Sequence, residues 1–490
     1  MGNNGHKLKK RGVKLSFYFL SLLIVAIAAI GGTYAWIGRS VTLPSTVEII
    51  QGTNSSTLDI AASERIGAVY QTLLNNYVEG VDKEALIEGA LSGMVEAVGD
   101  PYSQYLNTEE SENLDESISA SFEGIGAEIM SLNQQIVIVS PIKGSPAEKA
   151  GLLPNDIILS ADGESLQGLT ASEAVALIRG EKGSEVVLEI VRGDQTFKVN
   201  IIRDTIPIET VTFELDEEYP EIGIVHVSSF STPTYDDIVS AVTDLRTQGA
   251  TSFVFDFRQN PGGLLDQALK ISNMFLDDGD VIMQTQEKDA EPNKIVASDS
   301  EFGDFKITEP SVLLVDEGSA SASEIVAGAL QESSEIPLVG TTTFGKGTVQ
   351  TVYPLTESSE LKLTVAKWLT PNGNWIHEKG ISVDYEVALP EYATLTIIDS
   401  TATYEEGTVS EEVKNVEAML NAIGYAVEAD GYYDEATVEQ VASFQAANEL
   451  DATGIVTGDT ALAIVEKLRE VLTENDTQYD KAVEILMGNE

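Results

Sequence analysis

The sequence predicts an α/β protein whose central part alternates parallel strands with helices. Two apolar runs rich in β-branched residues, 310–315 and 337–340, flank a stretch with apolar residues at helical spacing. Such a strand–helix–strand unit makes its two strands parallel, so the residues that follow each strand lie at one edge of the sheet. The strand-like runs 223–230 and 251–257, each followed by a helical pattern, extend the same alternation.

Ser321 follows the first of these strands and Lys346 follows the second, 25 residues later (346 − 321). A serine hydroxyl becomes a strong nucleophile when a base removes its proton, and a lysine whose pKa is lowered by burial is such a base. The helix that starts behind Ser321 also offers main-chain N–H groups to an oxyanion. From the spacing alone, a flexible turn in front of a packed helix is an equally valid interpretation.

Two motifs around this pair resemble the C-terminal processing peptidases, which are serine proteases and often tail-specific. The motifs are GSASASE at 318–324 and FGKGTVQ at 344–350, and their separation is that of the family. The resemblance implies a crotonase/ClpP-like protease core with Ser321 as nucleophile, Lys346 as general base and Gln350 as the residue that orients the lysine. It implies no metal and no organic cofactor.

A third motif, Asn260-Pro261-Gly262-Gly263, ends another predicted strand on the side of Ser321. Two glycines let a substrate backbone come close and leave main-chain amides free. The family places part of its oxyanion hole here, so the resemblance assigns that role to Gly262 or Gly263 together with the amide of Ala322. An ordinary glycine turn is the alternative interpretation for each glycine.

Residues 119–203 resemble a PDZ domain (α+β), inserted ahead of the main part of the protease core at 204–395. A second family hallmark, SPAEKAGLLPNDIILSADG, covers 145–163. Arg179 ends the helix beside the expected peptide groove, where it either contacts a bound peptide or remains a solvated charge. Consecutive amides of a carboxylate-binding loop form a nest that captures a C-terminal carboxylate. The residues that match this loop are Glu123, Gly124, Ile125 and Gly126.

The N-terminal segment predicts a membrane anchor. Residues 1–14 are basic, and residues 15–37 contain no charged side chain. A stretch of about 20 apolar residues spans a bilayer, and a basic flank stays in the cytoplasm. We therefore expect a single-pass protein of a bacterial cell membrane, with a linker at 38–57 and the catalytic part on the cell-wall side. A cleavable signal peptide is the alternative, although no clear cleavage site follows.

Two helical regions flank the protease. Residues 58–118 resemble the N-terminal helical segment with which the family often forms homodimers, and a simple helical cap is the alternative. Residues 408–470 resemble the small all-α peptidoglycan-binding domain, marked by Gly-Tyr-Tyr-Asp at 431–434, although such domains sometimes act only as packing units. We expect an acidic tail over 471–490 that is either another short helix or disordered.

Composition excludes several classes of protein. The chain carries 79 acidic and 29 basic residues, a formal net charge of −50, which argues against a nucleic-acid partner. It has no cysteine, which excludes thiol nucleophiles, disulfides and thiolate metal sites. It has three histidines, and His226 alternates with apolar residues as a strand residue does, so a histidine-based triad is poorly supported.

Together these features predict a membrane-anchored, PDZ-regulated serine endopeptidase that acts on proteins with accessible C-terminal tails. A non-catalytic scaffold that joins a PDZ domain to the cell wall is the first alternative, and the joint presence of Ser321, Lys346 and Gln350 argues against it. A crotonase-like acyl hydrolase is the second. Such a hydrolase requires a pocket for a nucleotide, and neither the PDZ domain nor the peptidoglycan-binding module suggests a nucleotide ligand.

Overall fold

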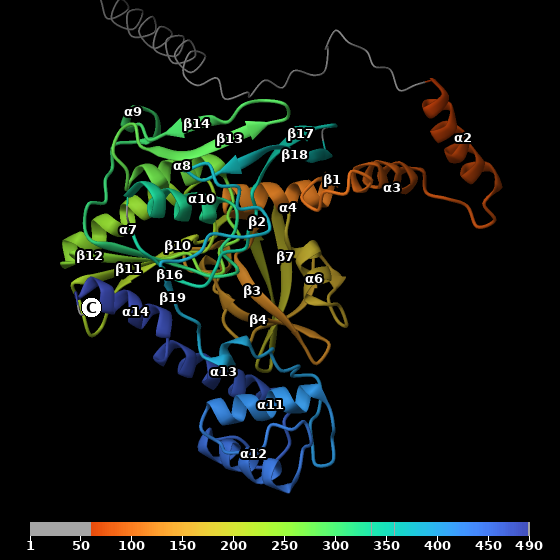
Figure 1. Cartoon of the computed structure of the whole chain (residues 1–490). Helices are drawn as coiled ribbons and strands as arrows, with labels where there is room; N and C mark the ends of the chain where they lie inside the picture. Colours follow the sequence, from red (N-terminus) through yellow and green to blue (C-terminus); the bar gives the residue numbers. More distant parts are fainter. Residues whose placement is uncertain (1–59, 335, 357, 489–490) are drawn as a thin grey trace, which may run out of the picture. The chain divides into compact units, whose positions relative to one another are not determined.

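The computed structural model describes residues 60–334, 336–356 and 358–488 (Figure 1). It divides into two units, residues 1–89 and 90–490, which are described separately. Within the described ranges, no helix is long and apolar enough to cross a bilayer. The expected basic tail, anchor and linker over residues 1–57 lie outside these ranges.

The first unit contains helix α2 (Ile60–Asn76) and the start of α3 (Lys83–Glu96), in agreement with the helical pattern predicted over this region. Three apolar side chains of α2, those of Ile66, Val69 and Leu73, are between 39% and 57% exposed. Their spacing of three and four residues places them on one side of the helix. The helix thus carries an apolar stripe that its own unit leaves exposed.

The protease core is built on a six-stranded sheet, and four of its strands (β11, β12, β15 and β16) form where the alternating pattern predicts them, whereas the pattern does not predict β10 and β19. The neighbours β11, β12, β15, β16 and β19 run parallel, and β10 joins the edge in the antiparallel direction. The strands are β10 (Val211–Leu215), β11 (Ile222–Val227), β12 (Ser252–Asp256), β15 (Ser311–Val315), β16 (Leu338–Gly340) and β19 (Tyr385–Glu386).

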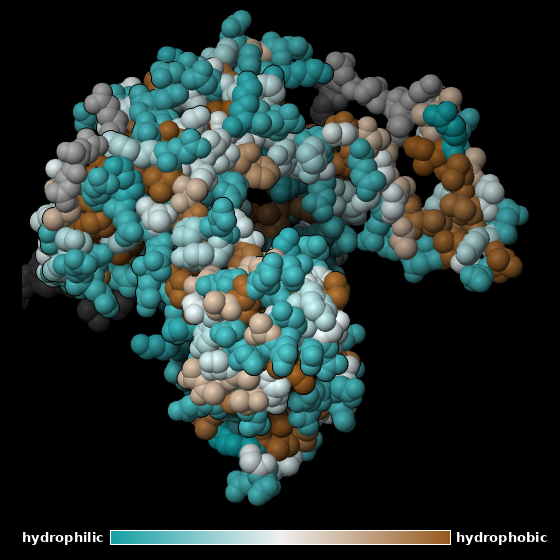
Figure 2. Space-filling model, turned by 60° about the horizontal axis from the view of Figure 1, so that its bottom comes forward, coloured by the Kyte–Doolittle hydropathy of each residue, from teal (hydrophilic) through white to brown (hydrophobic). Residues whose placement is uncertain are grey.

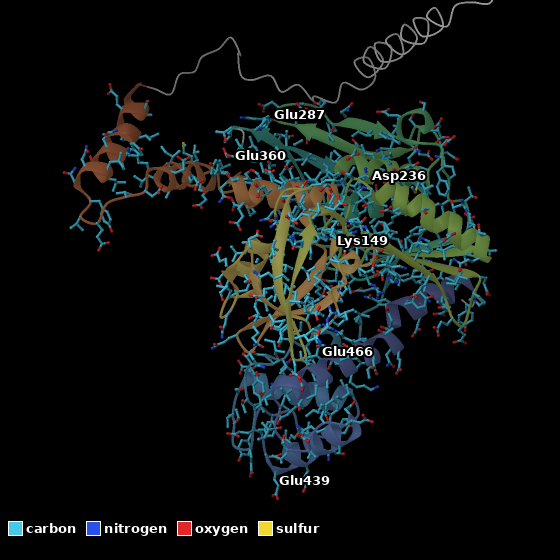
Figure 3. All side chains as sticks on the ribbon, turned by 180° about the vertical axis from the view of Figure 1, so that it is seen from behind. Lys149, Asp236, Glu287, Glu360, Glu439 and Glu466 are labelled. Carbon is cyan, nitrogen blue, oxygen red and sulfur yellow. The ribbon has the colours of Figure 1, made fainter. Side chains whose placement is uncertain are left out.

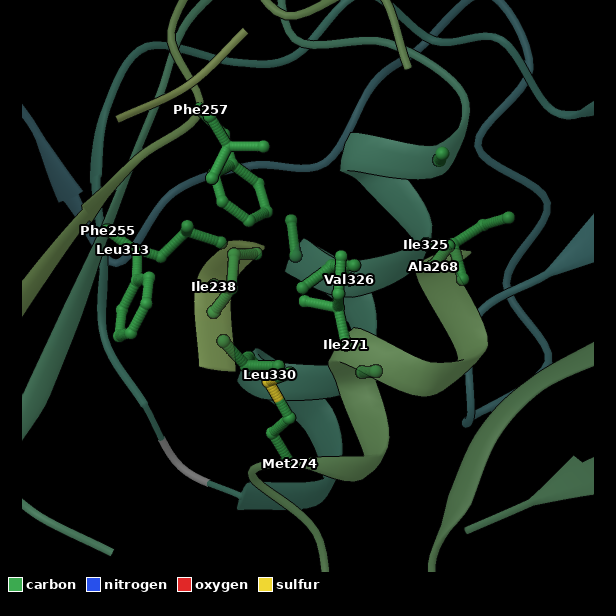
Figure 4. Packing of buried hydrophobic residues seen from close by; sticks show 14 of the residues in the cluster. Ile238, Phe255, Phe257, Ala268, Ile271, Met274, Leu313, Ile325, Val326 and Leu330 are labelled. Atoms are coloured by element: carbon green, nitrogen blue, oxygen red, sulfur yellow. The ribbon is translucent and has the colours of Figure 1, made fainter. Parts of the chain in front are cut away.

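One face of this sheet is covered by α7 (Thr234–Gln248), α8 (Leu265–Asn273) and α10 (Ala322–Ala329). Figure 4 shows Phe255 and Leu313 of the sheet facing a layer of helical side chains that includes Val326. All three of these side chains are buried, which removes apolar surface from water and fixes α10 against the sheet. The position of α10 in turn fixes the residue just before it, Ser321.

The opposite face is covered by α14 (Thr477–Leu486), which lies beside the sheet in Figure 1. Ala482 is fully buried against a cluster that includes Val254 and Leu314. The acidic tail expected over 471–490 thus contains a short helix, which is one of the two alternatives, and the sequence does not indicate that this helix packs on the sheet. Acidic residues lie on one side of this helix, and apolar residues lie on the other. The apolar side covers the second face of the sheet, because a parallel sheet is buried on both faces.

A second, smaller sheet lies beside the core in the order β1-β18-β13-β14, with β17 paired to β18. Strand β1 pairs with β18, so the segment just before it lies close to the loops of the protease core. The strands are β1 (Gln104–Leu106), β13 (Val281–Glu287), β14 (Asn293–Val296), β17 (Thr348–Pro354) and β18 (Glu360–Leu369). The remaining short elements near the core are α4 (Thr108–Ser119), α9 (Asp299–Phe302) and the π-helical turn Leu330–Ser334.

The predicted PDZ region has its own sheet, in the order β3-β4-β5-β7-β8, and its own buried core. The chain enters it through β2 and leaves it through β9, and these two strands pair with each other. The elements are β2 (Ser121–Gly124), β3 (Ala127–Leu132), β4 (Gln135–Pro141), α5 (Pro146–Lys149), β5 (Ile157–Ala161), β6 (Glu164–Ser165), α6 (Ala171–Ile178), β7 (Glu185–Arg192), β8 (Gln195–Ile202) and β9 (Asp204–Pro207).

The C-terminal module consists of a 3-10 turn (Glu391–Thr394) and the helices α11 (Glu411–Ala422), α12 (Glu435–Ala447) and α13 (Gly458–Glu474) around a separate core. The chain leaves the protease core near Ala388 and returns to the same place at Thr477, whose hydroxyl donates to the Ala388 carbonyl at 2.8 Å. The module is thus inserted between β19 and α14.

The surface reflects the negative net charge of the chain. Figure 3 shows Glu439 and Glu466 on the C-terminal module and Asp236 and Glu287 on the protease core, and all four are exposed. The face seen in Figure 2 is mostly hydrophilic, with hydrophobic residues scattered over it. Such a surface favours solubility and repels polyanions.

Candidate active site

All six residues predicted for the catalytic centre line one cavity of about 560 Å³. Its wall also includes Glu116 and Ile118 of α4, together with Ile208, which follows the PDZ region. Four of the six lie in the loops that follow β12, β15 and β16, as expected for the carboxyl edge of a parallel sheet, whereas Ala322 begins α10 and Gln350 belongs to β17. These residues are Gly262, Gly263, Ser321, Ala322, Lys346 and Gln350.

Ser321 occupies a strained backbone conformation, with φ 57° and ψ −110°, immediately before α10. Non-glycine residues rarely adopt positive φ, and such strain gathers at functional sites. Two hydrogen bonds keep it there. The Ser321 N–H donates to Glu324 Oε2 at 2.8 Å, and the Ile325 N–H donates to the Ser321 carbonyl at 2.9 Å.

Glu324 connects the two halves of the site. Its side chain is fully buried and accepts four hydrogen bonds. The donors are the N–H of Ser321 (2.8 Å), the hydroxyl of Thr343 (2.6 Å) and the N–H groups of Gly345 (2.6 Å) and Lys346 (2.8 Å). The sequence shows Glu324 only as the last residue of the GSASASE motif, and no local pattern indicates its hydrogen bonds to Thr343, Gly345 and Lys346.

Lys346 is half-buried at the cavity wall. Burial lowers the pKa of Lys346, and the neighbouring charge of Lys362 lowers it further, against the opposing effects of Glu324 and Asp100. The Tyr102 ring lies with its centroid 5.1 Å from Lys346 Nζ. These influences come from segments far apart in the sequence, and no motif links Tyr102 or Lys362 to the site.

The loop around Lys346 is fixed by aromatic side chains. Trp368 Nε1 donates to the Lys346 carbonyl at 2.7 Å, and Trp375 Nε1 donates to the Gly347 carbonyl at 2.9 Å. His377 Nδ1 accepts from the Gly347 N–H at 3.3 Å, which gives this histidine a structural role.

The predicted hydrogen bonds of Lys346 with Gln350 and with Ser321 are not formed in the described structure. Gln350 donates from Nε2 to the hydroxyls of Thr348 (3.0 Å) and Thr364 (3.1 Å). Among the described residues, no hydrogen bond joins Gln350 to Lys346, or Ser321 Oγ to Lys346 Nζ. Catalytic hydrogen bonds are often long without substrate and tighten when it binds. The orienting role of Gln350 therefore stays a prediction.

The glycine pair is shaped by close packing. A Cβ on Gly262 (φ +95°) would lie 2.5 Å from the Ala320 carbonyl oxygen, and one on Gly263 (φ +148°) would lie 2.2 Å from that of Phe230. The Gly262 N–H is occupied by Asn260 Oδ1 at 2.9 Å. In the described part of the chain, the N–H groups of Gly263 and Ala322 have no acceptor. They are therefore better candidates for oxyanion donors than the N–H of Gly262.

The predicted carboxylate-binding loop has the form of a nest. Gly126 has φ +72°, and a Cβ there would lie 2.5 Å from Ser145 Cβ. The carbonyls of Ile125 and Gly126 accept hydrogen bonds, whereas their N–H groups have no acceptor among the described residues. Glu123 instead fixes the loop from outside by accepting from the Lys182 N–H at 2.8 Å, and Gly124 ends β2.

Arg179 is not a solvated charge. Its Nη1 lies 2.9 Å from both carboxylate oxygens of Glu116, and its guanidinium stacks over the Phe122 ring at 4.5 Å. Glu116 lines the active-site cavity. The end of the PDZ helix α6 therefore contacts the wall of the candidate active site.

His226 lies away from the cavity. It is a strand residue of β11, as expected, and its Nδ1 lies 3.2 Å from Asp256 Oδ2. The hydrogen bond with Asp256 raises the pKa of His226.

Comparisons with known proteins identify the parts of the chain. The family "Peptidase family S41" matches residues 221–387, and "PDZ domain" matches 137–192. "Activating protease CtpB N-terminal domain" matches 25–110, and "Putative peptidoglycan binding domain" matches 409–464. These matches define the class of protein as a serine peptidase that carries a PDZ domain and a peptidoglycan-binding domain.

The chain is 43% identical over 478 residues to "Carboxy-terminal processing protease CtpA" of Bacillus subtilis (strain 168), which covers 97% of this chain and 99% of that protein. It therefore belongs to the carboxy-terminal processing proteases of family S41. It is 37% identical to "Probable CtpA-like serine protease" of Staphylococcus aureus (strain N315), over 89% of this chain and 87% of that one. A solved "Photosystem II D1 C-terminal processing protease" is 29% identical over 66% and 88% of the two chains, with a TM-score of 0.39. The predicted family and serine peptidase activity are confirmed.

Proposed function

We propose that this chain is a membrane-anchored, extracytoplasmic endopeptidase that cleaves proteins with accessible C-terminal tails through a serine–lysine dyad. The observation that carries the proposal is one cavity that holds Ser321, Lys346 and the N–H groups of Gly263 and Ala322, which have no acceptor among the residues that the structure describes. A nucleophile, a base and an oxyanion site are the parts that acyl transfer requires.

In the first half of the reaction, neutral Lys346 takes the proton of Ser321 Oγ as this oxygen attacks the scissile carbonyl. The carbonyl oxygen becomes negative and accepts hydrogen bonds from the Gly263 and Ala322 N–H groups. Lys346 then gives the proton to the leaving amine, and an acyl-enzyme remains. In the second half, Lys346 takes a proton from water as the water oxygen attacks the ester carbonyl, and Lys346 returns this proton to Ser321 Oγ as the ester C–O bond breaks and the new C-terminus leaves. Gln350 would orient the lysine.

The lowered pKa of Lys346 supports this role, because a lysine acts as a base only in its neutral form. Its main cause is burial, which disfavours the ammonium ion. A substrate that fills the cavity would displace more water and strengthen the same effect.

The PDZ domain would bind the substrate's end. The free N–H groups of Ile125 and Gly126 suit a C-terminal carboxylate, and a peptide would add as a strand beside the loop. The contact between Arg179 and Glu116 would link this event to the cavity.

Location and assembly follow from the flanking segments. Residues 15–37 would anchor the chain with residues 1–14 in the cytoplasm, and residues 408–470 would bind peptidoglycan. The apolar stripe of α2 supports a homodimer through 58–118, since exposed apolar surface favours association.

A serine-reactive probe tests the proposal. The wild-type chain should be acylated once, at Ser321, and should cleave a peptide with a free C-terminus, whereas Ser321→Ala should do neither. Wall binding without acylation or cleavage in the wild type would identify a scaffold instead.

A further inference from the structure

Arg258 joins the end of β12 to the C-terminal helix α14. Its side chain is 14% exposed and lies between two carboxylates. On one side, Nε and Nη2 donate to Asp256 at 2.9 Å and 2.6 Å. On the other side, Nη1 donates to Asp476 Oδ1 at 2.9 Å and to Gln478 Oε1 at 3.1 Å. Asp476 and Gln478 both belong to the start of α14.

Arg258 also begins the loop that carries the candidate oxyanion donor. Its neighbour Gln259 has φ 57° and is held by Asp316, which accepts from the Gln259 N–H at 2.8 Å and from Nε2 at 2.7 Å. The Asn260 carbonyl accepts from the Ala320 N–H at 3.0 Å. Each residue from 258 to 260 is thus fixed by a separate partner, and the partner of Arg258 outside its own strand is α14.

The start of α14 is itself well anchored. Asp476 caps the helix by accepting from the Tyr479 N–H at 3.0 Å, and Gln478 Nε2 donates to the Val387 carbonyl at 2.9 Å. Tyr479 donates its hydroxyl to Asp216. These bonds, with the burial of Ala482, hold the two acceptors of Arg258 at a fixed place on the sheet.

The contact between Arg258 and Asp476 is strengthened by the charges of the two side chains. Burial alone would raise the pKa of Asp256, but the hydrogen bonds from His226 and Arg258 lower it to about 2, so it is ionised at neutral pH. Arg258 therefore bridges two anions, Asp256 and Asp476, in a place with little solvent. Charge-assisted hydrogen bonds of this kind are roughly twice as strong as neutral ones.

We propose that Asp476 and Arg258 are positioning residues for the active site: α14 holds Arg258, and Arg258 fixes the loop that presents the Gly263 N–H group to the oxyanion. The inference rests on the proposed function, because it assigns Gly263 to the oxyanion hole. It goes further in giving the last helix of the chain, beyond the peptidoglycan-binding module, a part in catalysis.

Asp476→Asn tests the inference with little disturbance, because asparagine is an equally good N-cap and keeps the helix start. The loss of its charge should loosen Arg258 and lower kcat by about 10- to 100-fold, since small displacements of an oxyanion donor are costly, with KM almost unchanged. The rate of acylation by a serine-reactive probe should fall in the same proportion. Glu484→Gln, which changes an exposed carboxylate on the same helix, should leave both rates within about two-fold.

A double-mutant cycle separates positioning from general destabilisation. If Asp476 acts through Arg258, then combining Asp476→Asn with Arg258→Lys should lower kcat no further than Arg258→Lys alone. An Asp476→Asn variant with wild-type kcat would overturn the inference. So would a variant in which the thermal stability falls and KM changes together with kcat. Should the wild type itself show no Ser321-dependent acylation, the proposed function would fail, and this inference with it.

Discussion

Ser321 and Lys346 donate their main-chain N–H groups to the same oxygen atom, Glu324 Oε2, each at 2.8 Å. The two residues belong to loops that follow different strands, and the buried carboxylate fixes the distance between those loops. A nucleophile and its base must meet within hydrogen-bond reach, so the geometry of the proposed dyad would depend on a third residue to which the proposed mechanism gives no part in proton transfer.

Glu324→Gln should therefore lower both stability and activity. Glutamine would turn an N–H donor toward groups that are themselves donors, and a buried charged acceptor would be lost. We expect the free energy of unfolding to fall by about 2–4 kcal/mol and kcat by at least about ten-fold. Denaturant unfolding and peptide hydrolysis measure the two effects. Glu317→Gln, at an exposed carboxylate that accepts from Thr341, should change neither appreciably.

The dyad itself makes a sharper prediction. Ser321→Ala and Lys346→Ala should each reduce peptide cleavage by about 10³-fold or more, with unfolding unchanged and wall binding retained. Lys346→Arg should also be inactive, because arginine provides no neutral base. A chelator should have no effect on the wild type. Full activity in either alanine variant would exclude the serine–lysine mechanism.

Cleavage should rise with pH as Lys346 loses its proton, and Lys362 should control where it rises. The charge of Lys362 lowers the pKa of Lys346, so its removal raises that pKa. A base with a higher pKa is neutral only at higher pH. The pH profile of kcat/KM for Lys362→Gln should therefore move to higher pH, while Lys362→Arg should keep the wild-type profile. An unmoved profile in Lys362→Gln would show that Lys346 is not the titrating base.

Removal of the peptidoglycan-binding module should spare the protease only if α14 is kept. The hydrogen bond between Thr477 and Ala388 places the two ends of the insertion together. A chain in which a short Gly/Ser linker replaces residues 391–474 should therefore cleave a soluble peptide at a rate within about three-fold of wild type. It should no longer sediment with purified peptidoglycan. Unchanged sedimentation would show that the module does not bind the wall.

The PDZ domain should distinguish chain ends. Amidation of a substrate's C-terminus removes the charge that the Ile125 and Gly126 N–H groups would bind, so the intact enzyme should cleave the amidated peptide more slowly. Gly124 and Asp204 are paired across β2 and β9, so a short turn between them would replace residues 125–203. That variant should cleave both peptides equally. Equal rates on the intact enzyme would mean that the PDZ domain does not recognise chain ends.

The sequence predicts the parallel core and the position of Ser321 and Lys346 at one edge of it, where both line the same cavity, because apolar runs and turn motifs are local signals. It does not predict Tyr102, whose contact with Lys346 depends on the pairing of β1 with β18 across more than 250 residues (361 − 105). It also does not predict that the short helix α14 packs on the sheet, since acidic residues such as Asp480 and Glu484 conceal the apolar face around Ala482. Long-range contacts of this kind leave no periodicity to find.

The position of α14 also determines when the enzyme becomes complete during translation. Lys346 leaves the ribosome 140 residues before Leu486 (486 − 346). At about 5–20 residues per second, this interval lasts roughly 7–28 s. Throughout that time the nascent chain contains Ser321 and Lys346, yet the sheet face at Val254 and Leu314 has no helix to cover it. A ribosome that stops early, anywhere in the peptidoglycan-binding module, would release a chain whose sheet is uncovered and whose Arg258 lacks Asp476 and Gln478 as acceptors.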